Sequence, residues 1–298
     1  MSMNRPHAPL HGVRILSLAL NLPGPAALMR CRKMGAECVK LEPPAGDPMG
    51  HYNPKAYGEL HEGVKVHEAD LKTEAGQKVL HRELAKTDIL LTSFRPSALI
   101  KLGLGWKELH SKYPSLSQVA IVGAPGTRAE EPGHDLTYLA DNGLVPGVEL
   151  PATLYADMSG SLMASEAVLQ AALRKHERYA GGGDPHPEGL YLEVALSDAA
   201  AYLALPRRWG LTQPSGSVGG AHAGYRVYTC QDGRVAVAAL EPHFAAALCD
   251  VAGIQTEGIQ TMLKPATRDA IAAFFATQTR SQLDKLAVER DLPLHTMI

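Results

Sequence analysis

The sequence contains no run of eighteen consecutive apolar residues, which a membrane-spanning helix needs, so we expect no transmembrane segment. The N-terminal segment MSMNRPHAPLHG lacks the apolar core of a signal peptide, and the expected location is the cytoplasm. The formal net charge is only −2, so we expect neither a nucleic-acid-binding nor a membrane-binding surface. A bound anion would have to be held by a few local basic side chains.

Cysteine is also scarce, with four in 298 residues and no C-x-x-C spacing. We expect reduced thiols, and no metal site is predicted. Several common motifs are missing: GxGxxG after the first strand, the Walker A loop, HExxH and GxSxG. These absences disfavour a standard nucleotide-binding protein, a zinc protease and a serine hydrolase. We expect no prosthetic group.

The sequence does contain alternating strand and helix patterns in its first part. Apolar runs typical of buried strands lie at 13–20, 36–42, 89–94 and 115–123. Helical patterns separate them, one of which has Thr73 as a plausible N-cap. Such βαβ units form parallel sheets with helices on both faces. We therefore predict a Rossmann-like α/β domain whose ligand lies beyond the carboxyl ends of the strands.

The pattern changes after the glycine-rich segment 215–224. The pair Asp232-Gly233 lies between two strand-like runs and predicts a β-hairpin over 225–240. Helical patterns follow at 242–251, 268–276 and 279–289. We predict a large domain over residues 1–214 and a small α+β domain over residues 215–298.

Two neighbouring polar residues, His134 and Asp135, precede a predicted helix in the segment GHDLTY. Asp135 is the better N-cap, because a short carboxylate accepts hydrogen bonds from the free N–H groups of a first turn. This interpretation leaves His134 free to act as a general base. The alternative is a structural histidine, which is the commoner role of a lone histidine.

Two acidic residues also lie at predicted helix starts. Asp157 begins a long helical pattern over 155–179, as an N-cap or as a nucleophilic carboxylate that the field of the helix keeps ionised. Glu241 lies between the hairpin and Pro242. It either favours the helix dipole or closes over a cleft from the second domain.

Three basic residues are candidates for anion binding, because each lies in or after a strand-like run: Lys40, Arg95 and Lys101. Taken singly, each of them could equally be a solvated surface charge.

These residues belong to stretches that resemble the family III CoA-transferases (the CaiB/BaiF type) and, within them, the α-methylacyl-CoA racemases. The similar stretches occur in order along nearly the whole chain, among them MGAECVKLEPPAGDP, SFRPSALIKLGLGWKEL, GHDLTYLADNG, YADMSGSL and GYRVYTCQDGRVAVAALEPHF. The resemblance implies an interlocked homodimer and an acyl-CoA substrate, with coenzyme A as part of that substrate. Family members usually run on and return to the first domain, so we expect the end at DLPLHTMI to make the interlocking incomplete.

The resemblance also implies roles for the candidates. Asp157 matches the catalytic aspartate of the transferases, and His134 and Glu241 match the residues that join it in proton transfer in the racemases. Arg95 and Lys101 match basic positions near the phosphates and adenine of CoA.

Two reactions follow from these roles. In a racemase, His134 and Asp157 exchange the α-proton of a 2-methylacyl-CoA, and backbone N–H groups such as that of Asp157 stabilise the enolate. In a CoA-transferase, Asp157 attacks the thioester carbonyl. Having all three residues favours the racemase, whereas the form EPPAGDP, with Pro43 where the family often has arginine, is more similar to the transferases. A CoA-binding relative with little catalysis is the third hypothesis.

Overall fold

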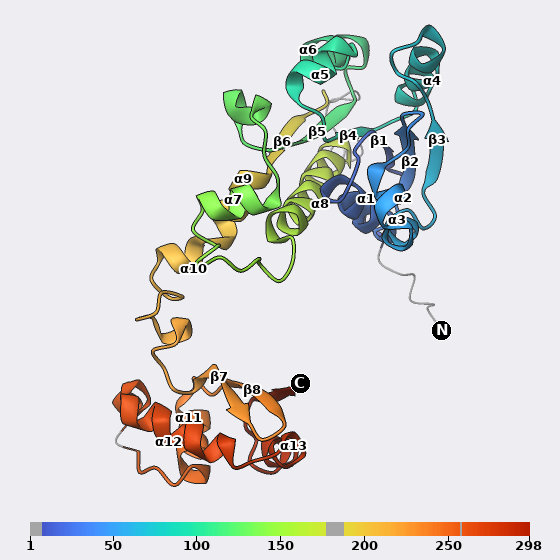
Figure 1. Cartoon of the computed structure of the whole chain (residues 1–298). Helices are drawn as coiled ribbons and strands as arrows, with labels where there is room; N and C mark the ends of the chain where they lie inside the picture. The colour runs from blue at the N-terminus through green and yellow to red at the C-terminus, as the bar shows by residue number, and fades with distance from the viewer. Residues whose placement is uncertain (1–7, 177–187, 257) are drawn as a thin grey trace. The chain divides into compact units, whose positions relative to one another are not determined.

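The structure is a computed structural model that describes residues 8–176, 188–256 and 258–298 (Figure 1). The end of the predicted helix at 177–179 and the first seven residues lie outside these ranges. The chain divides into two compact units, residues 1–204 and 205–298, whereas the sequence predicts a boundary after residue 214. Within the described residues, no helix has the length and apolar character required to cross a membrane.

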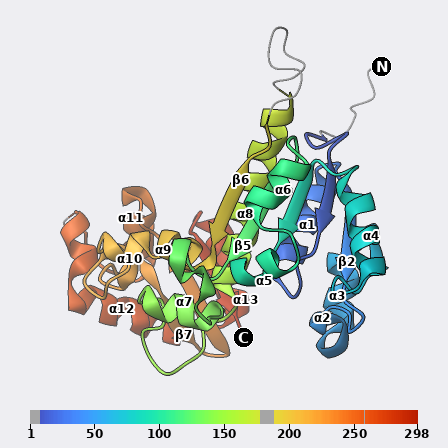
Figure 2. The same cartoon turned by 90° about the horizontal axis from the view of Figure 1, so that it is seen from above.

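The first unit is built around a six-stranded parallel sheet with the order β3-β2-β1-β4-β5-β6, whose strands are labelled in Figure 1 and of which Figure 2 shows β6, β5 and β2 from above. Its strands are β1 (Arg14–Ser17), β2 (Glu37–Glu42), β3 (Lys65–Glu68), β4 (Ile89–Thr92), β5 (Ser117–Val122) and β6 (Tyr191–Ala195). The order confirms the predicted Rossmann-like α/β fold. After β1 the sheet grows toward one edge through β2 and β3, and from β4 it grows toward the other edge through β5 and β6. A crevice therefore forms beyond the carboxyl ends of β1 and β4.

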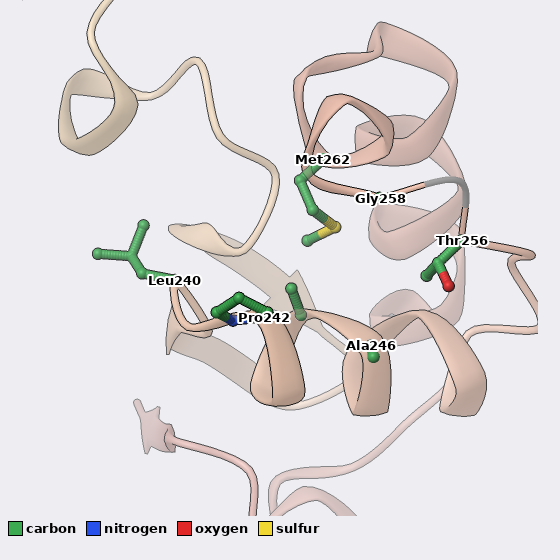
Figure 3. Close-up of a pocket in the computed structure, with 7 residues that line it drawn as sticks. Leu240, Pro242, Ala246, Thr256, Gly258 and Met262 are labelled. Atoms are coloured by element: carbon green, nitrogen blue, oxygen red, sulfur yellow. The ribbon is translucent and has the colours of Figure 1, made fainter.

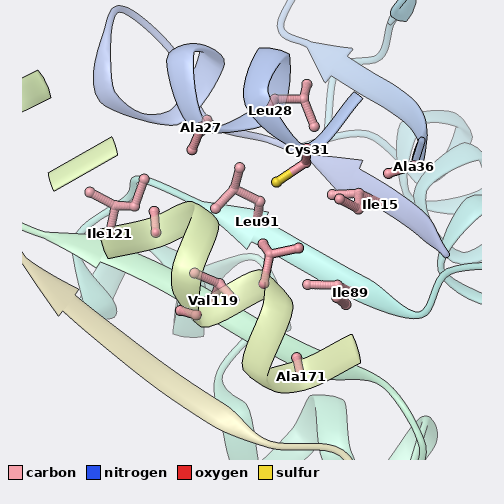
Figure 4. Close-up of a cluster of buried hydrophobic side chains, with 14 of the residues drawn as sticks. Ile15, Ala27, Leu28, Cys31, Ala36, Ile89, Leu91, Val119, Ile121 and Ala171 are labelled. Carbon is pink, nitrogen blue, oxygen red and sulfur yellow. The ribbon is translucent and has the colours of Figure 1, made fainter. Parts of the chain in front are cut away.

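Both faces of this sheet are covered by helices, which explains the continuous apolar runs of its strands. On one face, Ile15 packs with Leu28 and Val168, which belong to α1 (Pro23–Lys33) and α8 (Tyr155–His176) (Figure 4). On the other face, the next residue, Leu16, packs with Leu80. The helices of this second face are α4 (Glu74–Leu84), α5 (Pro96–Lys101) and α6 (Trp106–Lys112).

Local sequence signals explain where several helices begin. Thr73 caps α4 as predicted, because its hydroxyl accepts a hydrogen bond of 3.1 Å from the backbone N–H of Gly76. Proline supplies the first residue of α1 and α5, where its missing N–H costs nothing. The other helical segments of this unit are α2 (Pro48–Tyr52), α3 (Pro54–Leu60), η1 (Gly126–Glu130), α7 (Asp135–Asp141) and α9 (Leu196–Leu203).

The second unit is an antiparallel sheet covered by helices. The hairpin predicted at Asp232-Gly233 is present, and its strands β7 (Tyr225–Cys230) and β8 (Gly233–Ala238) are joined by β9 (Leu294–Met297), which was not predicted. Phe275 packs beneath the sheet against Tyr228. The helical segments of this unit are α10 (Leu205–Arg208), η3 (Ser217–Gly219), α11 (Pro242–Val251), η4 (Ile259–Leu263), α12 (Pro265–Ala276) and α13 (Arg280–Glu289).

Candidate active site

A cavity of about 660 Å³ lies in the first unit at the carboxyl edge of the sheet, where a parallel α/β fold places its ligands. Its volume is within the range of roughly 300–1,000 Å³ that is typical of small-molecule sites. The lining comes from the turn after β1, the segment of α2 and α3, the residue after β4, the end of β5 and the starts of α7 and α8. It includes Leu20–Pro23, Met49, Tyr52, Asn53, Ala56, Ser93, Val122, Gly133–Leu136, Leu154 and Asp157.

Asp157 lies in the first turn of α8, and it is the third residue of the helix rather than its N-cap. Its side chain is half-buried at the cavity wall. Burial and, to a lesser extent, the negative charge of Asp135 raise its pKa from 3.8 to about 6, although His134 acts to lower it. At neutral pH, Asp157 is therefore mostly ionised, but it is a better proton acceptor than an ordinary aspartate.

Asp135 does not cap its own helix, so this prediction was wrong. His134 is the N-cap of α7, with extended backbone angles, and Asp135 is the first helical residue. The buried carboxylate of Asp135 instead accepts a hydrogen bond of 2.9 Å from the backbone N–H of Asp157. It thus satisfies one of the free N–H groups in the first turn of α8 and fixes Asp157 relative to α7.

This contact changes one mechanistic expectation. From the sequence, the backbone N–H of Asp157 is expected to bind the enolate oxygen of a bound thioester. Because that N–H already donates to Asp135, it is not free for this role.

His134 lines the same cavity as Asp157 and has an exposed side chain. Its backbone is held by Thr137, whose hydroxyl accepts from the N–H of His134 at 3.0 Å and donates to its carbonyl at 2.7 Å. The structure therefore brings together two of the three predicted catalytic residues. The third, Glu241, is the N-cap of α11 in the second unit, and its catalytic role stays a prediction.

The basic candidates differ in their surroundings. Arg95 and Lys101 are exposed at the two ends of α5, after β4. Both lower the pKa of Glu130, after the larger effect of its hydrogen bonds from Ser97. Lys40, in contrast, is fully buried and paired with two carboxylates, so the structure does not support its predicted role in binding an anionic ligand.

A smaller cavity of about 140 Å³ lies within the second unit (Figure 3). Its lining is mostly apolar and includes Leu240 and Pro242, which flank Glu241, together with Met262. The volume is below the usual range for a substrate-sized site, and titratable side chains are not among its lining residues.

Comparison with known proteins identifies the family. The profile of CoA-transferase family III matches residues 10–297. The chain belongs to this family. Among solved structures, this CoA-transferase family III protein superposes with a TM-score of 0.81 on the hypothetical protein Rv3272 of Mycobacterium tuberculosis, at 22% identity over 98% of this chain and 84% of that one. A CAIB/BAIF family protein from Brucella suis gives a TM-score of 0.78 at 21% identity, with the same coverage. Both likenesses support the fold alone.

Curated relatives of this family III protein include both kinds of enzyme. It is 37% identical over 149 residues to the cinnamoyl-CoA:phenyllactate CoA-transferase of Clostridium sporogenes (46% of this chain, 36% of the relative). It is 33% identical over 196 residues to the succinyl-CoA–D-citramalate CoA-transferase of Chloroflexus aurantiacus (61% and 49%). It is 30% identical over 297 residues to the α-methylacyl-CoA racemase of Mus musculus (92% and 73%). The chain thus spans half or less of the length of the first two relatives.

Two features of the site were missed from the sequence. The first is the hydrogen bond from the backbone N–H of Asp157 to the carboxylate of Asp135. It joins the starts of two helices that are far apart along the chain, so local sequence patterns carry no signal for it. The second feature is the buried carboxylate of Asp47, which caps α2 and also binds the turn at Asn21. An aspartate followed by proline is a helix-start signal, so the cap itself was predictable.

Proposed function

We propose that the protein catalyses α-carbon proton transfer on a 2-methylacyl-CoA thioester, as a racemase or epimerase. One observation carries this proposal: a carboxylate whose burial raises its pKa to about 6 shares a cavity with an imidazole. The match to the mouse racemase, which spans 92% of this chain, supports the same reaction. Coenzyme A enters as part of the substrate, and a prosthetic group is not needed.

The chemistry needs two groups on opposite sides of the α-carbon. The thioester carbonyl acidifies the α-proton, one group removes it, and the other group returns a proton to the opposite face of the enolate. Asp157 and His134 are the two proposed groups, and each such transfer is typically worth ~10²–10⁴ in rate. Glu241 is kept as a third proposed residue on the resemblance alone.

The enolate oxygen needs hydrogen-bond donors other than the N–H of Asp157. The first-turn N–H groups of α7 border the same cavity, because Asp135 and Leu136 line it. The N–H of Thr137 donates to the carbonyl of His134 at 2.9 Å, whereas the N–H groups of Asp135 and Leu136, the first two of the helix, have no carbonyl partner within it. We propose that they stabilise the negative charge that develops on the thioester oxygen.

A CoA-transferase is the second candidate. It is favoured by the similarity to the CoA-transferases of Clostridium sporogenes and Chloroflexus aurantiacus and by Pro43. The carboxylate of Asp157 would attack the thioester carbonyl and form an acyl anhydride, with release of CoA as thiolate. The raised pKa of Asp157 suits this step too, because a more basic carboxylate is a stronger nucleophile. A CoA-binding relative with little turnover is the third candidate.

Arg95 and Lys101 are the proposed partners of the CoA phosphates, since both are exposed cations at the two ends of α5, the helix that follows β4. Replacing either with alanine should raise the KM for acyl-CoA and leave kcat and Tm nearly unchanged. The homodimer and the cytoplasmic location remain predictions.

Incubation with a 2-methylacyl-CoA in deuterated water separates the candidates. The racemase hypothesis requires α-deuteration that Asp157→Asn and His134→Ala abolish while both variants stay folded. Transfer of CoA to a free carboxylic acid, lost in Asp157→Asn and without α-deuteration, would select the transferase. Thermal stabilisation by CoA without either activity would select the third candidate. Asp141→Asn, which changes an exposed carboxylate of α7, is the matched control.

A further inference from the structure

The ammonium group of Lys40 lies in a closed cage of side chains beneath the cavity wall. Lys40 is on β2, and its side chain is completely buried. Its Nζ lies 2.6 Å from Asp47 Oδ2, 2.9 Å from Glu42 Oε1 and 2.8 Å from His61 Nε2. An ammonium has three N–H donors, so each donor has one acceptor.

The neighbours of His61 fix its role in this cage. Its Nδ1 lies 2.7 Å from the backbone carbonyl of Tyr57. A carbonyl only accepts, so Nδ1 carries the proton and Nε2 is left as an acceptor for Lys40. The ring is therefore neutral, in agreement with the lowering of its pKa by burial and by Lys40.

The three acceptors form a set that would suit a metal ion. The ligand atoms of Glu42, Asp47 and His61 lie within 4.8 Å of one another. The ammonium of Lys40 is within 2.9 Å of all three, so the cation that pairs with both carboxylates is covalently part of the chain. Two buried carboxylates without this cation would carry a large desolvation cost.

The cage reaches the cavity through Asp47. Its carboxylate accepts hydrogen bonds from the N–H of Asn21, at 3.1 and 3.2 Å, and from the N–H of Met49, at 3.0 Å. Asn21 has a φ of 63°, in the left-handed region, which is uncommon for non-glycine residues although asparagine adopts it more readily than most. The segments around Asn21 and Met49 both line the cavity, so a single carboxylate joins two parts of its wall.

We propose that Lys40 is a positioning residue: it acts as an internal cation that holds Asp47, and Asp47 in turn holds the Asn21 turn and the start of α2 against the substrate cavity. The effect on turnover rests on the proposed function, whereas the effects on stability and on the Asn21 turn do not. The rival role for a lysine at this strand is a direct contact with a CoA phosphate.

Lys40→Ala tests the proposal, with Lys65→Ala as the matched control, because Lys65 forms an exposed ion pair on the neighbouring strand β3. Breaking the buried cage should lower Tm by about 10 °C, whereas the control should shift it by only about 2 °C or less. Hydrogen exchange should rise first in the segments 20–23 and 49–56, while the buried part of α8 stays protected. Turnover should fall by about tenfold or more with little change in the KM for acyl-CoA.

Chemical rescue makes the test specific for a cation. n-Propylammonium matches the atoms that Lys40→Ala removes, and n-propanol is its neutral counterpart. The proposal requires that propylammonium, and not propanol, restores Tm and the protection of segment 20–23. If the variant folds only with added amine, comparing refolding in the two compounds gives the same decision.

Three results would overturn the proposal: equal rescue by propanol, exchange that rises uniformly over the first unit, or a raised KM for acyl-CoA without a loss of Tm. The exchange and Tm measurements need no substrate. They therefore stand even if the wild-type protein shows neither α-deuteration nor CoA transfer.

Discussion

Replacing Asp157 with asparagine should make the protein more stable at neutral pH while it removes activity. The carboxylate is half-buried beside Asp135, and burial together with that charge raises its pKa from 3.8 to about 6. The ionised form of this side chain therefore lowers the free energy of unfolding. Asparagine has nearly the same shape and carries no charge, so the variant escapes this cost.

The size of the effect follows from the pKa. Because one pKa unit is worth ~1.36 kcal/mol, a rise from 3.8 to about 6 corresponds to ~3 kcal/mol. The side chain keeps partial contact with solvent, and the first turn of α8 favours a negative charge, so we expect a net gain of about 1–2 kcal/mol. For a unit of this size, the gain corresponds to a rise in Tm of about 4 °C.

The sign of the pH dependence is fixed by the direction of the shift. Since the folded protein binds this proton more tightly than the unfolded chain does, the cost is absent below pH 3.8. It develops as the pH rises from 3.8 to about 6, and it is complete above that range. The difference in Tm between Asp157→Asn and the wild type should therefore be small near pH 4.5 and largest near pH 7.5.

Thermal unfolding followed by circular dichroism at these two pH values is a sufficient assay. Asp141→Asn, at an exposed position of α7, should shift Tm equally at both. A variant Asp157→Asn that is less stable than the wild type at pH 7.5, or whose Tm difference does not grow with pH, would refute the reasoning. The carboxylate would then be stabilised by the fold rather than destabilised.

Further predictions concern the surroundings of this carboxylate and the sheet edge. Asp135→Asn removes a charge that raises the pKa of Asp157 but keeps an oxygen for its N–H, so the acidic limb of the kcat/KM profile for α-deuteration should move to lower pH. Gly24→Ala would place a Cβ 2.2 Å from the Cβ of Ala19, and overpacking of this kind should cost about 1–3 kcal/mol in a urea unfolding experiment. Gly58→Ala, in α3 and with no atom within 4 Å of the added carbon, should instead stabilise by about 0.5–1 kcal/mol.

The sequence predicted the central part of the fold because buried strands carry a strong local signal. The strands β1, β2, β4 and β5 are covered on both faces, and their apolar runs were visible. Strand β3 was missed because its residues Lys65–Glu68 are exposed at the edge of the sheet and show no apolar run. Strand β9 was missed for a related reason, since its four residues Leu294–Met297 are only partly buried.

Only some residues of the candidate site were predictable from the sequence, because the prediction used only the residue type and its position at the start of a helix or the end of a strand. His134 and Asp157 were chosen on that basis and share a cavity in the structure. Lys40 was misassigned because the sequence shows a cation on a strand but not the three acceptors that surround it. The contact of Asp135 with the N–H of Asp157 depends on the packing of α7 against α8, which is a property of the tertiary structure.

Two carboxylates of the first unit, Asp47 and Asp157, have opposite electrostatic surroundings, and this contrast indicates which of them takes part in the reaction. Asp47 is fully buried, but an ammonium and two backbone N–H groups bind its oxygens, so its negative charge is stabilised by the fold. Asp157 has a second carboxylate beside it, and its pKa is raised to about 6. Burial and a neighbouring negative charge make a carboxylate such as Asp157 gain free energy when it accepts a proton or attacks a carbonyl carbon. Both proposed reactions therefore select Asp157 as the reacting group and leave Asp47 to hold the cavity in shape.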